Sequence, residues 1–438
     1  MKRHYRKKTF HVMLLLLLAF TTVLSACSGT GGTAGKPGEG GKVEIQLWSS
    51  ATAENAKPIE NAIAKFNESQ DDIVVKTLSN QDHQKQLTAI SGGSAPDIIV
   101  TQWNNIGPWS AAGAVQSLEE FIKRDGYDTS QIVPAALDRM KVNHEIFGLP
   151  ISMSMANKLF YNKQAFEEAG LTAPPETLEE LFAYAKKLTK KDAKGNITQM
   201  GFIPDYPWID NVFWPIIFNG SWDDGSGKLT ANQEANVKAI VYQMNYYREF
   251  GQESIDKFKS GMGGLETPQD PILTGKLSMI IGWENWYVEH RGEDKEVGVA
   301  PFPYPAANPE LKGSGMVSPI AMFIPSKAKH QDEAWKVMQY LLGEDVQIEY
   351  SIEFGSIPVL TKALDNPKLT ENQEVKELWD YYESAKNPNL KGFPNSIYIN
   401  EYLQTLNEET EKALKGQITA QEAMDNVVNK MQPIADKK

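Results

Sequence analysis

The chain has 438 residues, with 41% hydrophobic and 23% charged side chains, which is ordinary for a globular protein and longer than one hydrophobic core usually organises. Its formal net charge is -12, because 56 Asp and Glu outnumber 44 Lys and Arg. A surface of this charge repels nucleic acid phosphates and anionic lipid headgroups. We therefore expect two lobes and exclude nucleic acid as a partner.

The N-terminus has the features of an export signal. Five basic side chains between positions 2 and 8 precede an apolar stretch over residues 11–24, and small residues follow it. The alternative is an uncleaved transmembrane helix. The stretch is short for a span of about 20 residues, and Thr21 and Thr22 interrupt it, so we expect a leader that is removed.

Cys27 is the only cysteine, and the run from Leu24 to Cys27, LSAC, resembles the lipobox of bacterial lipoproteins. The resemblance implies that residues 1–26 are a signal peptide and that a diacylglyceryl group is attached to Cys27 through a thioether. Residues 27–42 would form a lipidated tether, which we expect to be flexible because it is rich in glycine and lacks large apolar side chains. The predicted location is the extracytoplasmic face of a bacterial cell membrane.

Strand and helix periods alternate from residue 43 onward. Residues 43–47 alternate between apolar and polar side chains, which predicts a strand that ends near Trp48. Apolar spacing predicts a helix over 59–66, and residues 73–75 predict the next strand. A buried strand is predicted at 97–100. Ligands of open α/β sheets lie at the carboxyl ends of such strands.

The middle of the chain is rich in helix signals. Thr177 and Glu180 form a capping box before an apolar stripe that continues to Leu188. A second amphipathic helix is predicted from about Asp332 to Leu342. Because strands and helices alternate over this length, the sequence predicts an α/β fold.

A set of short motifs in a fixed order resembles the family 1 extracellular solute-binding proteins. These are the substrate-capturing subunits of carbohydrate ABC importers, similar to maltose-binding protein. The motifs are Ala95-Pro96-Asp97-Ile98, Leu149-Pro150, Tyr161-Asn162-Lys163, Pro174-Pro175-Glu176-Thr177, Gly275-Lys276-Leu277-Ser278-Met279 before Trp283, Gly298-Val299-Ala300-Pro301-Phe302-Pro303, Ala334-Trp335 and Gly355-Ser356-Ile357-Pro358.

The resemblance implies a two-lobed α/β fold with a hinge, a sugar held in the interlobe cleft, and lobe closure that signals occupancy to a membrane permease. The N-terminal lobe would contain residues 43–151 and 314–358, and the C-terminal lobe 152–313 and 359–438. We expect a monomer that binds a carbohydrate, with an oligosaccharide favoured, and that serves ABC permease subunits with a separate ATPase subunit. No cofactor is predicted.

A sugar cleft needs flat rings that stack on the sugar and polar groups that bond its hydroxyls. Three clusters of such residues are predicted to open toward the cleft, and Trp283 aligns with the family's stacking tryptophan. The candidate ligand-binding residues are Trp48, Thr101, Trp103, Asn104, Asp210, Asn211, Trp214, Trp283, Glu284 and Asn285. Each tryptophan has a structural alternative, because tryptophan most often packs in a core.

Other conspicuous residues are predicted to be structural. We expect Asp97 to fix its loop by bonding backbone amides, and Trp109 and Trp335 to pack internally. Trp222 precedes a hairpin-like turn and has no assigned role. The four histidines that follow the leader are scattered without the spacing of a zinc site, so no metal is predicted.

Two alternative functions stay open. A glycoside hydrolase needs only two carboxylates about 5 to 10 Å apart, and Glu284 with Asp210 would be the candidates. A surface sensory or adhesion lipoprotein would have a permanent protein partner. Serine hydrolase and zinc protease motifs are absent from the sequence, and the Gly225–Lys228 segment lacks the spacing of a phosphate loop. We therefore predict a binding protein and not an enzyme.

Overall fold

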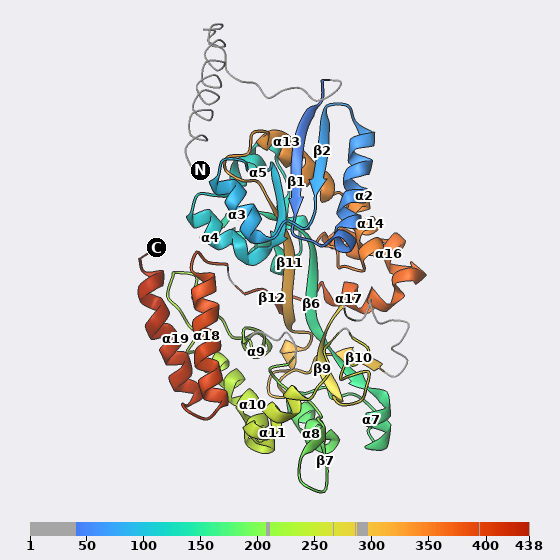
Figure 1. The fold of residues 1–438 in the computed structure, drawn as a ribbon, viewed down its shortest axis with the longest axis vertical. Coiled ribbons are helices and arrows are strands. Elements are labelled where there is room, and N and C mark those ends of the chain that lie inside the picture. The colour runs from blue at the N-terminus through green and yellow to red at the C-terminus, as the bar shows by residue number, and fades with distance from the viewer. Residues whose placement is uncertain are drawn as a thin grey trace, which may run out of the picture. The chain divides into compact units, whose positions relative to one another are not determined.

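The chain folds around one mixed sheet (Figure 1). The computed structural model describes residues 41–206, 211–265, 267–284, 286, 297–393 and 395–437. Within these residues the sheet has eight strands. They are β1 (Val43–Ser49), β2 (Ile73–Leu78), β3 (Ile98–Gln102), β6 (Leu149–Asn162), β9 (Met279–Trp283), β10 (Val297–Pro301), β11 (Gly315–Phe323) and β12 (Leu390–Lys391).

Several predictions concern residues beyond the described ranges. They are the signal peptide 1–26, the lipid attachment at Cys27, most of the tether, and the candidate ligand residues Asp210 and Asn285. Because the structure does not describe these residues, all four stay predictions.

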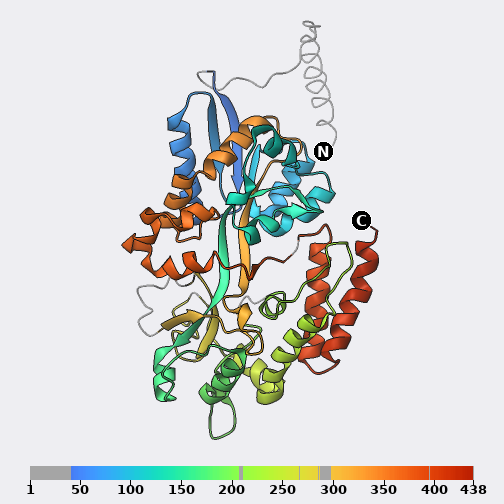
Figure 2. The ribbon, with the colours of Figure 1, turned by 180° about the vertical axis from the view of Figure 1, so that it is seen from behind.

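The strands run in the order β10, β6, β11, β3, β1, β2, with β9 also paired to β6 and β12 to β11. The pairs of β1 with β2 and β3 are parallel, whereas β11 is antiparallel to both β3 and β6. β6 has 14 residues and pairs with strands at both of its ends. Figures 1 and 2 show β6 and β11 running side by side from one group of elements to the other.

Helices and two short hairpins complete the fold. The helices that accompany β1 to β3 are α2 (Ala53–Ser69), α3 (His83–Ser91), α4 (Ile106–Ala111), α5 (Glu119–Asp125), α6 (Pro134–Asp138), α13 (Gln331–Leu341), α14 (Glu344–Phe354), α15 (Thr361–Leu364), α16 (Pro367–Thr370) and α17 (Trp379–Ser384). Those that accompany β9 and β10 are α7 (Lys163–Glu168), α8 (Leu178–Leu188), α9 (Phe213–Ile217), α10 (Glu234–Phe250), α11 (Gln252–Ser260), α18 (Ile399–Leu414) and α19 (Ala420–Ala435). The hairpins are β4 (Lys141–Val142) with β5 (Glu145–Ile146) and β7 (Lys190–Lys191) with β8 (Ile197–Gln199).

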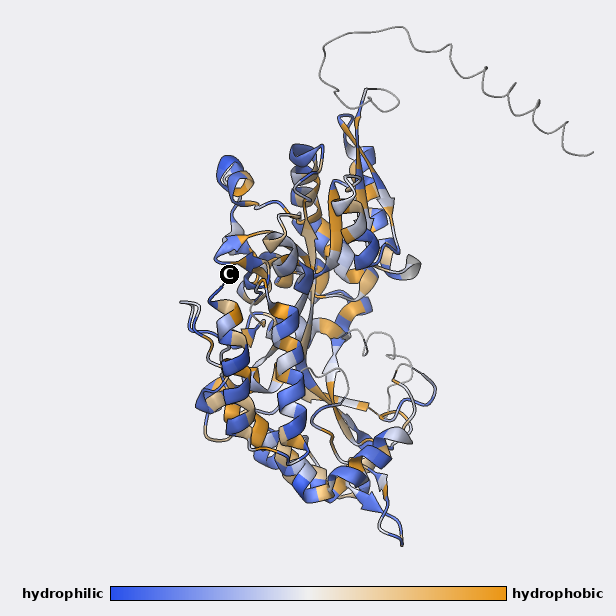
Figure 3. Cartoon of the chain, turned by 60° about the vertical axis from the view of Figure 1, so that its left-hand side comes forward, coloured by the Kyte–Doolittle hydropathy of each residue, from blue (hydrophilic) through white to orange (hydrophobic). Residues whose placement is uncertain are grey.

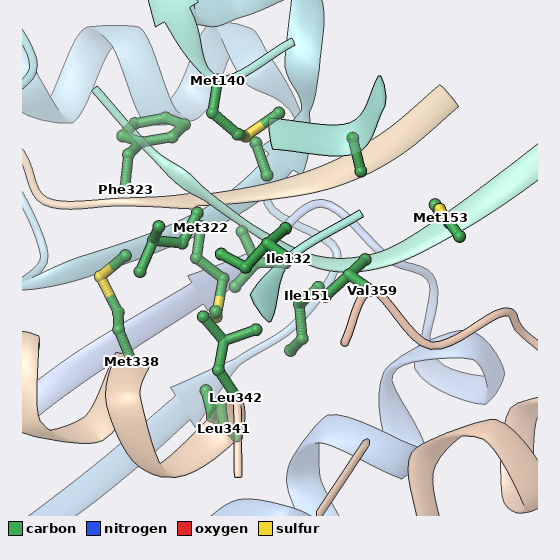
Figure 4. Packing of buried hydrophobic residues seen from close by; sticks show 14 of the residues in the cluster. Ile132, Met140, Ile151, Met153, Met322, Phe323, Met338, Leu341, Leu342 and Val359 are labelled. Atoms are coloured by element: carbon green, nitrogen blue, oxygen red, sulfur yellow. The ribbon is translucent and has the colours of Figure 1, made fainter. Parts of the chain in front are cut away.

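Two separate hydrophobic cores divide these elements. In the first, Ile151 of β6 lies near Leu341 of α13, and Met338 of α13 lies near Met322 of β11, as Figure 4 shows. Met153 of β6 belongs to the same core. The second core contains the other half of β6 together with β9, α8 to α11, α18 and α19. The predicted two-lobed α/β fold is therefore confirmed.

The local sequence signals explain the elements that they predicted. Thr177 accepts a hydrogen bond from the backbone N–H of Glu180, and the Glu180 side chain returns to the backbone of Thr177, so the capping box that begins α8 is confirmed. In Figure 3 the helices next to the C-terminus carry blue and orange residues along their length. Their buried residues, which include Leu406 and Met424, lie on the inner faces expected of amphipathic helices.

The cores divide the C-terminal part of the chain at a different point from the predicted boundary. Buried side chains from Val359 to Leu390 belong to the first core, whereas the predicted C-terminal lobe contained all of 359–438. A hydrogen bond at 3.1 Å from the Val359 backbone N–H to the Gln347 amide oxygen is one contact that holds this segment to α14. The lobe boundaries stay a prediction, and we propose that this one lies near residue 391.

Among the helices of the described residues, none combines the length and apolar character that crossing a bilayer requires. Across the same residues, His, Asp and Glu side chains form no group of three or more that could hold a metal ion.

Candidate functional site

The sheet topology brings several predicted ligand residues toward the middle of β6. β3 runs parallel to β6 and ends at Gln102, so Trp103 arrives at this level from the first lobe. Trp48 of β1 pairs with Ile99 and lies level with Phe323, just before the first residue of β6. β9 is antiparallel to β6 and delivers Trp283 opposite Ala156 from the second lobe. Strands of both lobes therefore end near the same stretch of β6.

The register gives the scale of this arrangement. Gln102 is opposite Ile320 of β11, and Ile320 is opposite Ser152 of β6. Ala156, the partner of Trp283, lies four residues further along, which is about 13 Å of extended strand. The two strand ends are therefore separated along the sheet by roughly this distance.

Two serines form a polar floor between these strand ends. Ser154 of β6 and Ser318 of β11 are directly opposite each other. Both are half-buried, whereas their strand neighbours Met153, Met155 and Val317 are buried. Neither serine was among the ligand residues predicted from the sequence. The alternation of serine with methionine over residues 152–155 was the available signal, because side chains at every second position of a strand share a face.

Five candidates keep some accessible surface: Trp48, Trp103, Asn104, Asn211 and Trp283 are all half-buried. The indole N–H of Trp48 donates to the Gln46 side chain at 3.3 Å. Thr101, in contrast, has 2% of its surface exposed. Apart from Asn211, these residues lie at the strand ends where the sequence predicted them, and their part in ligand binding stays a prediction.

Trp103 is held from one side by Arg139. The guanidinium carbon of Arg139 lies 3.6 Å from the centroid of the Trp103 ring, the geometry of a cation–π contact. Arg139 is buried and its Nε–H donates to the carbonyl of Val317 at 3.0 Å. The amide of Asn395 donates to the carbonyl of Trp103 at 3.2 Å. These contacts fix the orientation of the ring.

Asn211 lies just before α9 and is half-buried. Its side-chain amide donates to the Asn407 side chain of α18 at 2.9 Å. This contact ties the loop before α9 to α18.

Trp214 is in the core of the second lobe, which corrects its placement among the ligand residues. It has no exposed surface, and its indole N–H donates to the carbonyl of Pro204 at 2.7 Å. Phe213, Tyr242 and Phe302 pack around the ring. Every described residue of the short helix α9 is buried, so a ligand has no access to this ring.

Glu284 is also buried, with 1% of its surface exposed. Its carboxylate accepts a hydrogen bond from the backbone N–H of Met155 at 2.8 Å and another from the Ser154 hydroxyl. Burial raises the pKa of Glu284 to about 7, although these hydrogen bonds act in the opposite direction. The side chain therefore ties the end of β9 to the middle of β6, and in this structure it presents no surface to a ligand.

A Glu284→Gln variant should be more stable than the parent at pH 8, by about 3 kcal/mol, and similar to it at pH 4.5. The pKa in the folded state exceeds that of the unfolded chain, so the parent loses stability as the pH rises from 4.5 to 7, and glutamine has no proton to lose. Chemical denaturation at the two pH values measures this. Glu401→Gln, at an exposed position, is the control, and equal effects of both substitutions would contradict the prediction.

The residues predicted to be structural occupy the expected places. The Asp97 carboxylate accepts hydrogen bonds from the backbone N–H groups of Gln46 and His330, at 3.0 and 3.2 Å. Trp335 has no exposed surface and Trp109 has 4%. These three predictions are confirmed.

The fold and the facing strand ends define a two-lobed binding protein. The model of the bacterial extracellular solute-binding protein family matches residues 49–348. The chain therefore belongs to the bacterial extracellular solute-binding proteins, as the motifs predicted.

Relatives by sequence cover nearly the whole chain. The sn-glycerol-3-phosphate-binding periplasmic protein UgpB of Rhizobium meliloti is 24% identical over 411 residues, which are 88% of this chain and 92% of that protein. The protein of the same name from Escherichia coli K12 is 24% identical over 422 residues, covering 88% and 91%.

Solved structures share the fold. The cyclic alpha-maltosyl-1,6-maltose binding protein of Arthrobacter globiformis has a TM-score of 0.74 at 19% identity, covering 91% of this chain and 100% of that chain. The structure of CpMnBP1 with bound mannotriose has a TM-score of 0.72 at 23% identity, covering 89% and 99%. At these identities the likeness concerns the fold.

Proposed function

We propose that this protein captures a short oligosaccharide outside the cytoplasm and delivers it to the permease subunits of an ABC importer. The observation that carries this proposal is the arrangement of the half-buried Trp103 and Trp283 at strand ends of the two lobes, with Ser154 and Ser318 between their levels. Rings and hydroxyl groups together suit the apolar faces and polar rims of sugars. Contact from both lobes lets a ligand favour a closed state.

Structural neighbours support an oligosaccharide as the solute, whereas the relatives by sequence support sn-glycerol 3-phosphate. The formal net charge of -12 opposes an anionic solute, so we favour the neutral sugar. The same arrangement supports binding without catalysis, because the Glu284 carboxylate is occupied by the backbone of β6.

A thermal-shift panel of the exported chain tests the solute class. A ligand present at a hundredfold over its dissociation constant adds about 2.7 kcal/mol to the folded state. We expect mannotriose, maltose or a related oligosaccharide to raise the melting temperature and sn-glycerol 3-phosphate to leave it unchanged. A rise with sn-glycerol 3-phosphate alone would overturn the oligosaccharide assignment.

We further propose that the mature chain is a monomer anchored by lipid on Cys27. The lipobox-like run supports this, since the thioether needs the sulfur of that side chain. In cells fed a fatty acid analogue, the parent should carry the label and a Cys27→Ser variant should lose it entirely. Ser28→Ala, one position further on, should keep the label. Labelling of the Cys27→Ser variant would contradict the anchor.

A further inference from the structure

The chain passes from the first core to the second directly after β12. Leu390 is buried in the first core and Phe393 in the second, so the chain crosses between these two positions. We call residues 390–393, 395 and 396 the crossing segment. Trp103, a candidate ligand residue, packs against side chains of both cores. The ring and the crossing segment therefore both belong to the junction between the lobes.

The crossing segment contacts the neighbourhood of Trp103 at two further points. The side-chain amide of Asn395 donates to the carbonyls of Trp103 and Arg139, at 3.2 and 3.1 Å. Gly107 of α4 lies against Ser396, and a Cβ at residue 107 would collide with the Ser396 carbonyl. Glycine allows this close approach of two backbones. The loop of Trp103 and the crossing segment therefore pack without spare room.

Gly392 of the crossing segment packs directly against the Arg139 side chain. A Cβ added at residue 392 would lie 2.5 to 2.7 Å from Nε, Cγ and Cδ of Arg139. Gly392 is not among the described glycines with a positive φ, so the close approach, and not the backbone conformation, explains the glycine. The Arg139 Nε–H also donates to the carbonyl of Val317 of β11 at 3.0 Å. The position of the guanidinium therefore depends on β11 and on the crossing segment.

The guanidinium in turn supports the Trp103 ring. Its central carbon lies 3.6 Å from the ring centroid, so Arg139 occupies one face of the indole and leaves the opposite face for a ligand. A sugar gains from stacking only where the ring is presented to it in advance. Displacement of the guanidinium therefore weakens binding without removing an atom that touches the sugar.

We infer that Arg139 is a positioning residue of the ligand site, and that the crossing segment sets the orientation of Trp103 through it. Hinge residues absorb backbone rotation when two lobes move. A rotation at Gly392 must displace the guanidinium, because no space separates the two. The binding role of Arg139 rests on the proposed function, whereas the coupling of Gly392 to the Trp103 ring does not.

Indole NMR signals of the mature chain, residues 27–438, test the coupling. The spectrum of a Trp103→Phe variant identifies the Trp103 signal by its disappearance. Gly392→Ala should shift this signal, because the added methyl group displaces the guanidinium. Gly261→Ala is the matched control, since a Cβ at the end of α11 meets carbonyl oxygens at ordinary distances of 3.7 and 3.8 Å. A Trp103 signal that Gly392→Ala leaves in place would overturn the inference.

Arg139→Lys tests the same coupling from the side of the cation. Lysine keeps the positive charge but lacks the planar group that stacks on the ring and the Nε donor. The Trp103 signal should shift in this variant while unfolding stays cooperative. If Gly392→Ala does not fold, Arg139→Lys decides the question alone, and an unshifted signal in it would overturn the inference.

Isothermal titration with mannotriose and maltose tests the binding role. Gly392→Ala and Arg139→Lys should each raise the dissociation constant about tenfold. Because the glycine acts through Arg139, the double variant should bind no more weakly than Arg139→Lys alone. Additive losses, or parent affinity in either single variant, would overturn the inference and leave the proposed function standing. A parent that binds neither sugar would overturn the proposed function instead, and the Trp103 signal would still decide the coupling.

Discussion

Replacing Trp283 by alanine should weaken oligosaccharide binding at least about a hundredfold while the protein still folds and melts cooperatively. Trp283 ends β9, keeps accessible surface beside the Ser154 and Ser318 floor, and is the second lobe's half-buried tryptophan at this site. Removing a stacking ring costs more in the complex than in the free protein, because the free protein leaves part of the ring in water. Isothermal titration and circular dichroism measure the two effects.

Phe182→Ala is the matched control for this substitution. Phe182 is a half-buried aromatic residue of the same lobe, on α8, which lies well away from the middle of β6 in both ribbon views (Figures 1 and 2). Binding should be unchanged in it. Loss of cooperative unfolding in Trp283→Ala would show that the ring is structural, and unchanged affinity would show that the site lies elsewhere.

Replacing Glu409 by alanine should lower the free energy of unfolding at pH 7 by about 2 to 3 kcal/mol. Glu409 of α18 has 1% of its side-chain surface exposed and accepts hydrogen bonds from Lys412 and Lys430, both at 2.6 Å, and from Asn426 at 2.9 Å. These contacts join α18 to α19. Breaking a buried ion pair usually lowers the free energy of unfolding by about 3 to 5 kcal/mol. We expect a loss near the lower end of that range because both lysines are partly exposed.

The contribution of Glu409 should depend on pH in a defined direction. Burial alone would raise its pKa, but the hydrogen bonds from Lys412, Lys430 and Asn426 outweigh burial and hold the pKa at about 2. The folded pKa lies below that of the unfolded chain, so the stabilisation is complete above pH 4.5 and disappears as the pH falls toward 2.

Denaturant titrations of the parent and Glu409→Ala at pH 7 and pH 3 test both statements. Glu411→Ala is the control, since Glu411 is on the same helix and pairs with Lys415 at an exposed position. An exposed ion pair contributes little to the free energy of unfolding. Equal losses of unfolding free energy in the two variants would contradict the stabilising role of Glu409. A loss from Glu409→Ala that does not shrink at pH 3 would contradict its pH dependence.

Local patterns predicted the helices and strands of the fold well, because the formation of a helix or strand depends mainly on residues that are close in sequence. The alternation in β1 and the capping box of α8 each involve residues within a few positions of one another. Motif order supplied the two-lobed architecture. The boundary that we propose near residue 391 is different, since it rests on α14 packing with the segment after Val359, which local periodicity does not encode.

The site was predicted in part for the same reason. Trp48 and Trp283 lie in the last two positions of β1 and β9, Trp103 follows β3, and the sequence predicted ligand residues at the carboxyl ends of strands. Trp214 was misplaced because a tryptophan beside polar residues has the same local pattern in a core and in a cleft. Ser154 and Ser318 face each other only through the pairing of β6 with β11, a contact between distant parts of the chain.

The central claim is that a sugar lies between the strand ends of the two lobes. A crystal structure of the mature chain, grown with the oligosaccharide that gives the largest thermal shift, tests it most directly. We predict sugar density that contacts Trp103 from one lobe and Trp283 from the other, over Ser154. Sugar density that touches neither tryptophan, in crystals where the site is open to solvent, would contradict the claim.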